Sequence, residues 1–204
     1  MRFEGASAGE LARVTHDARR IYPYLLPYQA RNDAPLQRRL GLLLQRSVLV
    51  AHPDLGAELP LPSRDERLPV GFVSHQFHNH TVWHVITRGW LAGLRRRGFD
   101  CFGYQVGKRE DECSEVSRRD CVRFRSGTWS LREWADVVRG DRLHALIYPA
   151  LGYSKTANRL ALARPAPVQC VTLGHCETSG YPAMDYFLSG ALMEPDDGDA
   201  HYTE

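Results

Sequence analysis

Four of the nine histidines lie within ten consecutive positions of the 204-residue chain, at His75, His78, His80 and His84. A neutral imidazole can take a proton from an attacking hydroxyl or donate a hydrogen bond to a phosphate oxygen. His80 is our candidate catalytic residue, because it lies where a predicted strand over 70–74 leads into a predicted helix over 82–97. Ligands of open α/β sheets bind at such strand ends, and helix amides there favour anions such as a diphosphate. The alternative is that these histidines cap the helix or are solvated.

A metal site is the rival chemistry for the same cluster. His78 and His80 are two residues apart, and His80 and His84 are one helical turn apart, a spacing at which two imidazoles can share an ion. No local carboxylate completes the set and no HExxH motif is present. We therefore expect no metal or other cofactor, and keep a metal-dependent hydrolase as the less favoured alternative.

A second candidate segment is LIYPALGYSK at 146–155, where a predicted strand breaks at proline and glycine. Gly152 would let the backbone approach a ligand closely. Ser154 can bond a phosphate, and it can equally cap the next helix.

A third candidate segment follows the predicted strand over 168–173. It is a loop of small and polar residues bounded by two glycines, and such loops carry exposed amides and hydroxyls to the edge of a sheet. A simple turn explains the glycines equally well. Cys176 lacks an identifiable partner for nucleophilic chemistry. The candidate binding residues here are Leu173, Gly174, His175, Thr178, Ser179 and Gly180.

The elements that must position these residues alternate between short apolar runs and helical patterns from residue 68 onward. This alternation predicts an α/β fold with a mostly parallel, Rossmann-like sheet flanked by helices. Further strands are expected over 99–106, 122–124, 143–148 and 186–188. Ser130 and Glu133 have capping-box spacing for a helix that ends near Gly140.

Residues 1–66 have a different pattern. Apolar residues at helical spacing predict helices over 11–24 and 36–50, the second with cap residues Asn32 and Asp33 and with Pro35 in its first turn. Four prolines between 53 and 69 predict that regular structure stops there. We expect a helical segment and Pro-rich linker over 1–66, followed by a Rossmann-like lobe over 67–204.

The composition excludes several classes of protein. Twenty-six Lys and Arg against 24 Asp and Glu give a net charge of +2, which is too balanced to indicate a nucleic-acid partner. Five cysteines without a CxxC pair favour a reducing, cytoplasmic compartment over a disulfide framework. No apolar run suggests a signal peptide or a membrane span.

Several motifs together resemble the O-linked N-acetylglucosamine transferase family, especially its bacterial members with tetratricopeptide repeats. They are VGFVSHQFHNH at 70–80, RPAPVQ at 164–169, LGHCETSG at 173–180, MDYFLSG at 184–190 and LMEP at 192–195, ending in HYTE. The resemblance covers roughly residues 68–204. It implies a metal-independent glycosyltransferase with two facing Rossmann-like lobes, a UDP-sugar donor and a protein or peptide acceptor.

The resemblance also implies roles for particular residues. His80 matches the family's active-site histidine, and Leu173, Gly174 and the 178–180 loop match positions that line its cleft. We expect this chain to be the first catalytic lobe and to need a second lobe, or a neighbouring polypeptide, that supplies most contacts to UDP. The alternative within this lineage is a non-catalytic binding or regulatory remnant.

Overall fold

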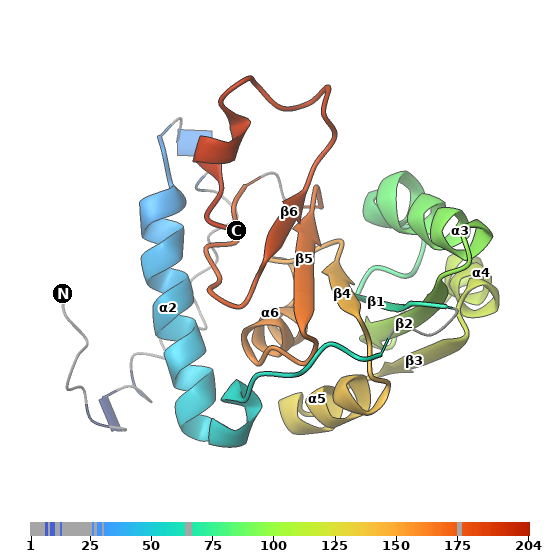
Figure 1. The fold of residues 1–204 in the computed structure, drawn as a ribbon, viewed down its shortest axis with the longest axis horizontal. Coiled ribbons are helices and arrows are strands. Elements are labelled where there is room, and N and C mark those ends of the chain that lie inside the picture. The colour runs from blue at the N-terminus through green and yellow to red at the C-terminus, as the bar shows by residue number, and fades with distance from the viewer. Residues whose placement is uncertain are drawn as a thin grey trace.

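The computed structural model describes residues 7, 9, 10, 13, 26, 28, 29, 31–63, 67–174 and 177–204. Its centre is a six-stranded sheet with the order β3-β2-β1-β4-β5-β6, in which all neighbouring strands run parallel (Figure 1). The predicted Rossmann-like sheet is therefore confirmed. The strands are β1 Pro69–Ser74, β2 Asp100–Val106, β3 Arg123–Gly127, β4 Ala145–Tyr148, β5 Val168–Thr172 and β6 Tyr186–Leu188.

Helices cover both faces of the sheet, which explains why its central strands are apolar on both sides. Val70 and Phe72 of β1 pack in one buried cluster with residues of α3 (Arg88–Arg96) and α4 (Glu112–Asp120). Val73 faces the other way and packs with residues of α5 (Leu131–Gly140) and α6 (Lys155–Leu162). The alternation along β1 follows from the period of two in a strand.

Serine side chains cap the N-termini of two helices, α5 and α6. Ser130 Oγ accepts a hydrogen bond from the backbone N–H of Glu133, and the Glu133 carboxylate accepts from the backbone N–H of Ser130 at 2.8 Å. This capping box begins α5, as predicted, and the helix ends at Gly140. Ser154 Oγ likewise accepts from the backbone N–H of Ala157 and caps α6.

Two elements differ from the sequence prediction. The predicted helix over 82–97 is confirmed, since residues 81–96 are helical, but its first part contains a π-helical turn, Trp83–Thr87, that precedes α3. Residues 113–120, for which no element was predicted, lie in α4, whose buried residues are Ser114 and Ser117. A helix that buries hydroxyls instead of large apolar side chains carries no strong apolar period.

The N-terminal part of the described chain is dominated by α2 (Ala34–Ala51), which confirms the predicted helix over 36–50. Asn32 accepts a hydrogen bond from the backbone N–H of Ala34 at 3.1 Å, whereas the side chain of Asp33 makes no capping bond. A short 3-10 helix, Pro53–Gly56, follows α2, and residues 57–63 have no regular structure. The predicted helix over 11–24 lies outside the described residues, apart from residue 13.

Helix α2 is docked on the lobe rather than separated from it. Val48 and Leu55 belong to the same buried cluster as Leu160 of α6, and α2 runs alongside the sheet and α6 in Figure 1. Gly41 approaches the loop before β6 so closely that an added Cβ would lie 2.0 Å from the Gly180 carbonyl oxygen. Among the described residues, no helix is long and apolar enough to cross a membrane.

The same substitution is expected to have opposite effects at two helical glycines. Gly41→Ala should lower the free energy of unfolding by about 1–3 kcal/mol, because the new methyl overlaps backbone atoms that cannot yield cheaply. In Gly89→Ala of α3, the added Cβ has no atom of a neighbouring residue within 4 Å. This variant should raise the free energy of unfolding by up to about 1 kcal/mol, because alanine has the higher helix propensity. Urea denaturation of both variants checks the pair, and equal effects would contradict the close docking of α2.

Candidate active site

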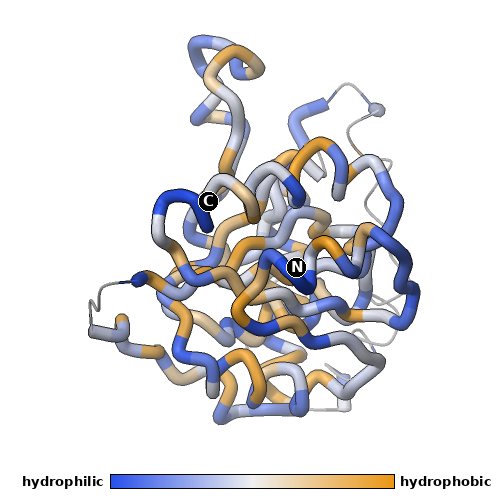
Figure 2. Tube along the Cα trace, turned by 90° about the vertical axis from the view of Figure 1, so that its right-hand side faces the viewer, coloured by the Kyte–Doolittle hydropathy of each residue, from blue (hydrophilic) through white to orange (hydrophobic). Residues whose placement is uncertain are grey.

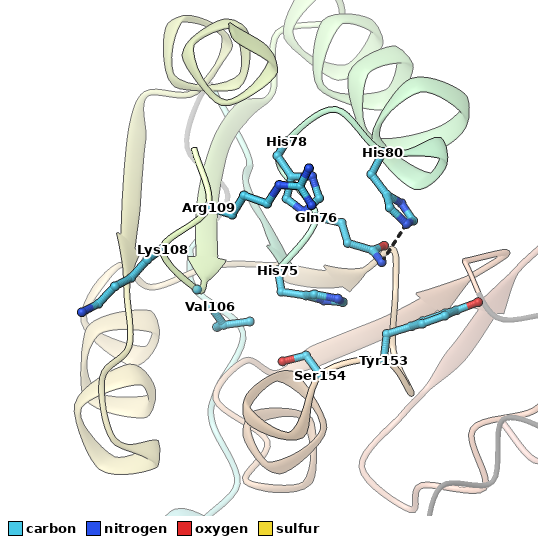
Figure 3. A pocket seen from close by; sticks show the side chains of 10 residues that line it. His75, Gln76, His78, His80, Val106, Lys108, Arg109, Tyr153 and Ser154 are labelled. Atoms are coloured by element: carbon cyan, nitrogen blue, oxygen red, sulfur yellow. Dashed lines mark hydrogen bonds between the residues drawn. The ribbon is translucent and has the colours of Figure 1, made fainter. Parts of the chain in front are cut away.

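The candidate site lies where the order of strands reverses. β1 pairs with β2 on one side and with β4 on the other, so the chain leaves these two neighbouring central strands in opposite directions. The loops that follow these strands lead to opposite sides and leave a crevice between them. Such a switch point is the usual ligand site of an open parallel sheet. A cavity of about 500 Å³ is found there (Figure 3), lined by His75, Gln76, His78, His80, Val106, Gly107, Lys108, Arg109, Tyr153 and Ser154.

The loop after β1, residues 75–80, carries three histidines into this cavity, and we call it the histidine loop. Its backbone is fixed from the side of α4. The backbone N–H of Asn79 donates to Asp111 Oδ2 at 2.7 Å, and Ser114 Oγ donates to the Phe77 carbonyl at 2.7 Å. Phe77 is fully buried, so the loop is anchored by an apolar side chain as well as by these bonds.

Both ring nitrogens of His80 are engaged in the described structure. Nδ1 accepts a hydrogen bond from the backbone N–H of Val82 at 3.2 Å, and Nε2 lies 3.3 Å from the Gln76 side-chain amide (Figure 3). Burial lowers the pKa of His80, and the nearby His78 and Arg109 lower it further. His80 is therefore a neutral imidazole at pH 7.

The electrostatic environment of the cavity is basic. None of the described residues that line it is Asp or Glu, whereas Arg109 and Lys108 contribute fixed positive charges. Figure 3 shows the Arg109 side chain directed toward His78 and Gln76, with Lys108 pointing away from them. Such a cavity favours a ligand that carries negative charge or several hydrogen-bond acceptors.

The histidines are not arranged around a metal ion. His84 Nε2 is paired with Asn79 Oδ1 at 2.9 Å, and the rings of His78 and His80 meet edge to face at 5.8 Å between centroids. Within the described part of the chain, no three His, Cys, Asp or Glu side chains form a group that could hold a metal.

Two of the predicted binding residues lie at the end of β4, next to the histidine loop. Gly152 has a φ of 96°, which favours glycine, and its N–H donates to Asn158 Oδ1 at 2.8 Å. Ser154 lines the cavity, but its hydroxyl caps α6. The alternative of helix capping, open from the sequence, is thus what the structure contains.

The loop after β5 approaches the same edge through its first two residues. Leu173 packs against the buried cluster of Val82, Ile86 and Ala150, the first of which lies two residues after His80. Gly174 lies so close to the loop after β4 that an added Cβ would be 1.6 Å from the Pro149 carbonyl oxygen. His175 lies outside the described residues.

The other predicted residues of this loop have different neighbours. Thr178 is buried, and its hydroxyl bonds to Thr203 Oγ1 at 2.9 Å and to the Glu204 carboxylate. The backbone N–H of Ser179 donates to the same carboxylate at 2.8 Å. Gly180, with a φ of 67°, packs on α2. Thr178, Ser179 and Gly180 are therefore not among the described residues that line the cavity.

Six residues that line the cavity were not predicted from the sequence, namely Gln76, Val106, Gly107, Lys108, Arg109 and Tyr153. The signal for Lys108 and Arg109 was present, because a charged loop directly after a predicted strand must lie at the same edge of a parallel sheet. Gln76 follows the strand by two residues and could have been found by the same argument. Tyr153 lies beside Gly152 and Ser154, which were both selected.

Comparisons with known proteins place these observations in a family. The family model described as Glycosyl transferase family 41 matches residues 13–204. The UDP-N-acetylglucosamine--peptide N-acetylglucosaminyltransferase of Caenorhabditis elegans is 31% identical over 144 residues, which are 64% of this chain and 12% of that protein. The probable enzyme of the same description, SPINDLY, from Oryza sativa subsp. japonica is 26% identical over 149 residues, 69% of this chain and 16% of that protein.

A solved structure agrees with the fold. A mutant O-GlcNAc transferase of Thermobaculum terrenum superimposes with a TM-score of 0.66, covering 97% of this chain and 40% of that chain at 22% sequence identity. The chain thus spans well under half of this structure and, at 12% and 16%, a small part of the two relatives above.

The titration of His75 tests the geometry of the cavity. Burial, followed by His78 and His80, lowers the pKa of His75 from 6.5 to about 4. The unfolded chain therefore binds this proton first as the pH falls, so the contribution of His75 to the free energy of unfolding should decrease between pH 6.5 and about pH 4 and level off below. Proton NMR of the His75 ring checks this, together with urea unfolding of wild type and His75→Asn, in which the decrease should be smaller. A His75 ring that titrates at 6.5 or higher would contradict the buried placement.

Proposed function

Because the chain belongs to glycosyl transferase family 41, we propose that it forms one lobe of an enzyme that transfers a sugar from a UDP-sugar to a protein side chain. N-acetylglucosamine is the proposed sugar, since the C. elegans and rice relatives carry that sugar in their names. The acceptor is a protein or peptide. The activity belongs to the assembled enzyme, of which this chain would be the part that presents His80.

One observation carries the proposal. His80 lies at the switch point of the sheet, in a basic cavity, within a chain matched by the family model over residues 13–204. A catalytic histidine and an anionic leaving group are both expected at the switch point, because parallel sheets bind their ligands there. A structural histidine would not need an open cavity around it.

The proposed reaction is a single displacement with inversion at the sugar. The acceptor hydroxyl oxygen forms the new bond to the anomeric carbon while the bond from that carbon to the diphosphate oxygen breaks. His80 lies beside these groups, where it either takes the hydroxyl proton or donates a hydrogen bond to an oxygen. In the second case the hydroxyl proton passes to an oxygen of the departing diphosphate. Arg109 offsets the negative charge that develops on the departing diphosphate.

The other predicted binding residues have supporting roles in this proposal. Gly152 and Gly174 let the loops after β4 and β5 lie close to each other and to a ligand. Leu173 packs beneath the start of the helix that follows His80. Ser154, His175, Thr178, Ser179 and Gly180 remain proposed contacts of the donor or acceptor, the last three after movement of their loop.

The proposal extends to organisation and location. We propose that residues 67–204 form the first catalytic lobe and that residues 1–66 join it to tetratricopeptide repeats. A second lobe, in the same protein or a neighbouring polypeptide, would complete the UDP site. A bacterial cytoplasm fits this assignment, and the four cysteines that the structure describes are free, as expected in a reducing compartment.

Replacement of His80 tests the proposal. In a chain joined to its second lobe, His80→Ala should reduce transfer by about 10²–10⁴-fold, because a positioned acid, base or hydrogen-bond donor contributes that much. The measurement is transfer of labelled sugar from UDP-N-acetylglucosamine to a peptide library. Circular dichroism should show an unchanged fold.

His84→Ala is the matched control, since this exposed histidine lies one turn further along and its ring hydrogen-bonds to the Asn79 side chain, which does not line the cavity. It should transfer at the wild-type rate. Full activity of His80→Ala would contradict the assignment of His80. No transfer by the joined wild-type protein would favour the non-catalytic remnant instead.

A further inference from the structure

The hydrogen bond from Val82 determines which nitrogen of His80 carries its proton. A backbone N–H can only donate, and Val82 N–H points at His80 Nδ1 from 3.2 Å. Nδ1 must therefore present a lone pair. Because a neutral imidazole has a single N–H, the proton of His80 lies on Nε2.

The Gln76 side chain is the partner that faces Nε2. Gln76 is only 4% exposed, and its own backbone N–H is held by Ser74 Oγ at 2.9 Å. Its amide nitrogen lies 3.3 Å from His80 Nε2, while its Oε1 is buried without a hydrogen-bond partner among the described residues. Two N–H donors would then oppose each other while a buried acceptor is left unpaired.

A half turn of the Gln76 amide removes the opposition between the two donors. The oxygen and nitrogen of an amide have nearly the same shape, and their assignment follows from the hydrogen bonds around them. After the turn, Oε1 accepts from His80 Nε2–H, and the NH₂ takes the buried place at which no described residue is a partner. Either orientation leaves one polar atom of the amide without such a partner, so the hydrogen bond to His80 makes the turned amide the favoured arrangement.

The charges around His80 support the neutral form. The titratable and charged groups that act on it are His75 and His78 from the same loop and Arg109 from the loop after β2. All three can carry only positive charge. Among the described residues that line the cavity, no carboxylate is present to stabilise an imidazolium.

We propose that Gln76 is a positioning residue that, together with the Val82 amide, holds His80 as the Nε2–H tautomer and makes it a hydrogen-bond donor in the cavity. The consequence of this tautomer for catalysis rests on the proposed function. At 3.3 Å the bond between the two side chains is long, so an oxygen of an incoming ligand can share the Nε2 proton. Of the two roles open to His80, donation to an oxygen is the one this geometry assigns.

NMR of the ¹⁵N-histidine-labelled chain tests the proposal without a sugar donor or a second lobe. At pH 7 the two-bond ¹H–¹⁵N correlations should show His80 as the Nε2–H tautomer, with a directly observable Nε2 proton. A His80 ring protonated at Nδ1 would overturn the proposal. Because this measurement does not depend on transfer, it can succeed or fail independently of the glycosyltransferase assignment.

Three variants separate positioning from a merely structural role. Gln76→Leu removes the acceptor, so the Nε2 proton should exchange with water faster and its signal should weaken or disappear. Gln105→Leu is the matched control, because it removes another fully buried amide whose nitrogen donates to the Arg109 carbonyl instead of His80. That variant should leave the Nε2 signal in place.

Gln76→Glu introduces a carboxylate at the same position and should raise the pKa of His80 above its wild-type value, because a negative acceptor favours the imidazolium. The pKa of His80 in this variant and the tautomer of His80 in the wild-type chain together test the proposal even if Gln76→Leu does not fold. An unchanged His80 pKa in Gln76→Glu, or an unchanged Nε2 signal in folded Gln76→Leu, would overturn the proposal.

Discussion

The Asp111 carboxylate is the contact on which the candidate site depends, because it joins the histidine loop to the first turn of α4. One oxygen accepts from the backbone N–H of Asn79 at 2.7 Å, and the other accepts from the backbone N–H of Cys113 at 2.9 Å. The bond from Asn79 is the main cause that lowers the pKa of Asp111. The carboxylate is therefore ionised at neutral pH, and one charged side chain both starts a helix and fixes the loop that presents His80.

Most of the fold could be predicted from the sequence, because the parallel strands are short apolar runs that no other element explains. Helix α5 could also be predicted, since the capping box of Ser130 and Glu133 is a local signal for its start. Helix α4 was not, because Asp111 is paired with a serine at the third helical position and the helix buries Ser114 and Ser117. Its stability comes from caps and from contacts with distant residues, such as the bond from Trp83 Nε1 to Ser117 Oγ at 2.7 Å.

The site was predictable only in part, for a related reason. The end of β1 and the end of β4 could be located from the strands, so His80, Gly152 and Ser154 were found at the right edge of the sheet. The neighbours of Thr178, Ser179 and Gly180 could not be predicted, because they depend on Gly41 and Glu204, which are far away along the chain. Contacts of this kind leave no local pattern in a single sequence.

The site gathers three histidines but draws its charge from elsewhere. Burial and the mutual proximity of the rings lower the pKa values of His75 and His80, so both are neutral at pH 7. The Arg109 side chain is directed toward the same cavity (Figure 3). The histidines therefore contribute directed hydrogen bonds, and the arginine contributes the attraction for an anion. The two roles come from different loops, since the loop after β1 supplies the directed hydrogen bonds and the loop after β2 supplies the positive charge.

The distribution of polar residues along the chain and its small net charge are consistent with this local origin of charge. Figure 2 shows hydrophilic and hydrophobic segments interleaved along the trace rather than gathered at one end, and the net charge of the chain is only +2. An anionic ligand would therefore feel little attraction from the molecule as a whole. Its recognition depends on the few groups at the switch point, and their geometry is set by hydrogen bonds to backbone amides. A small displacement of the histidine loop would consequently change the chemistry of the site more than a change of several surface charges.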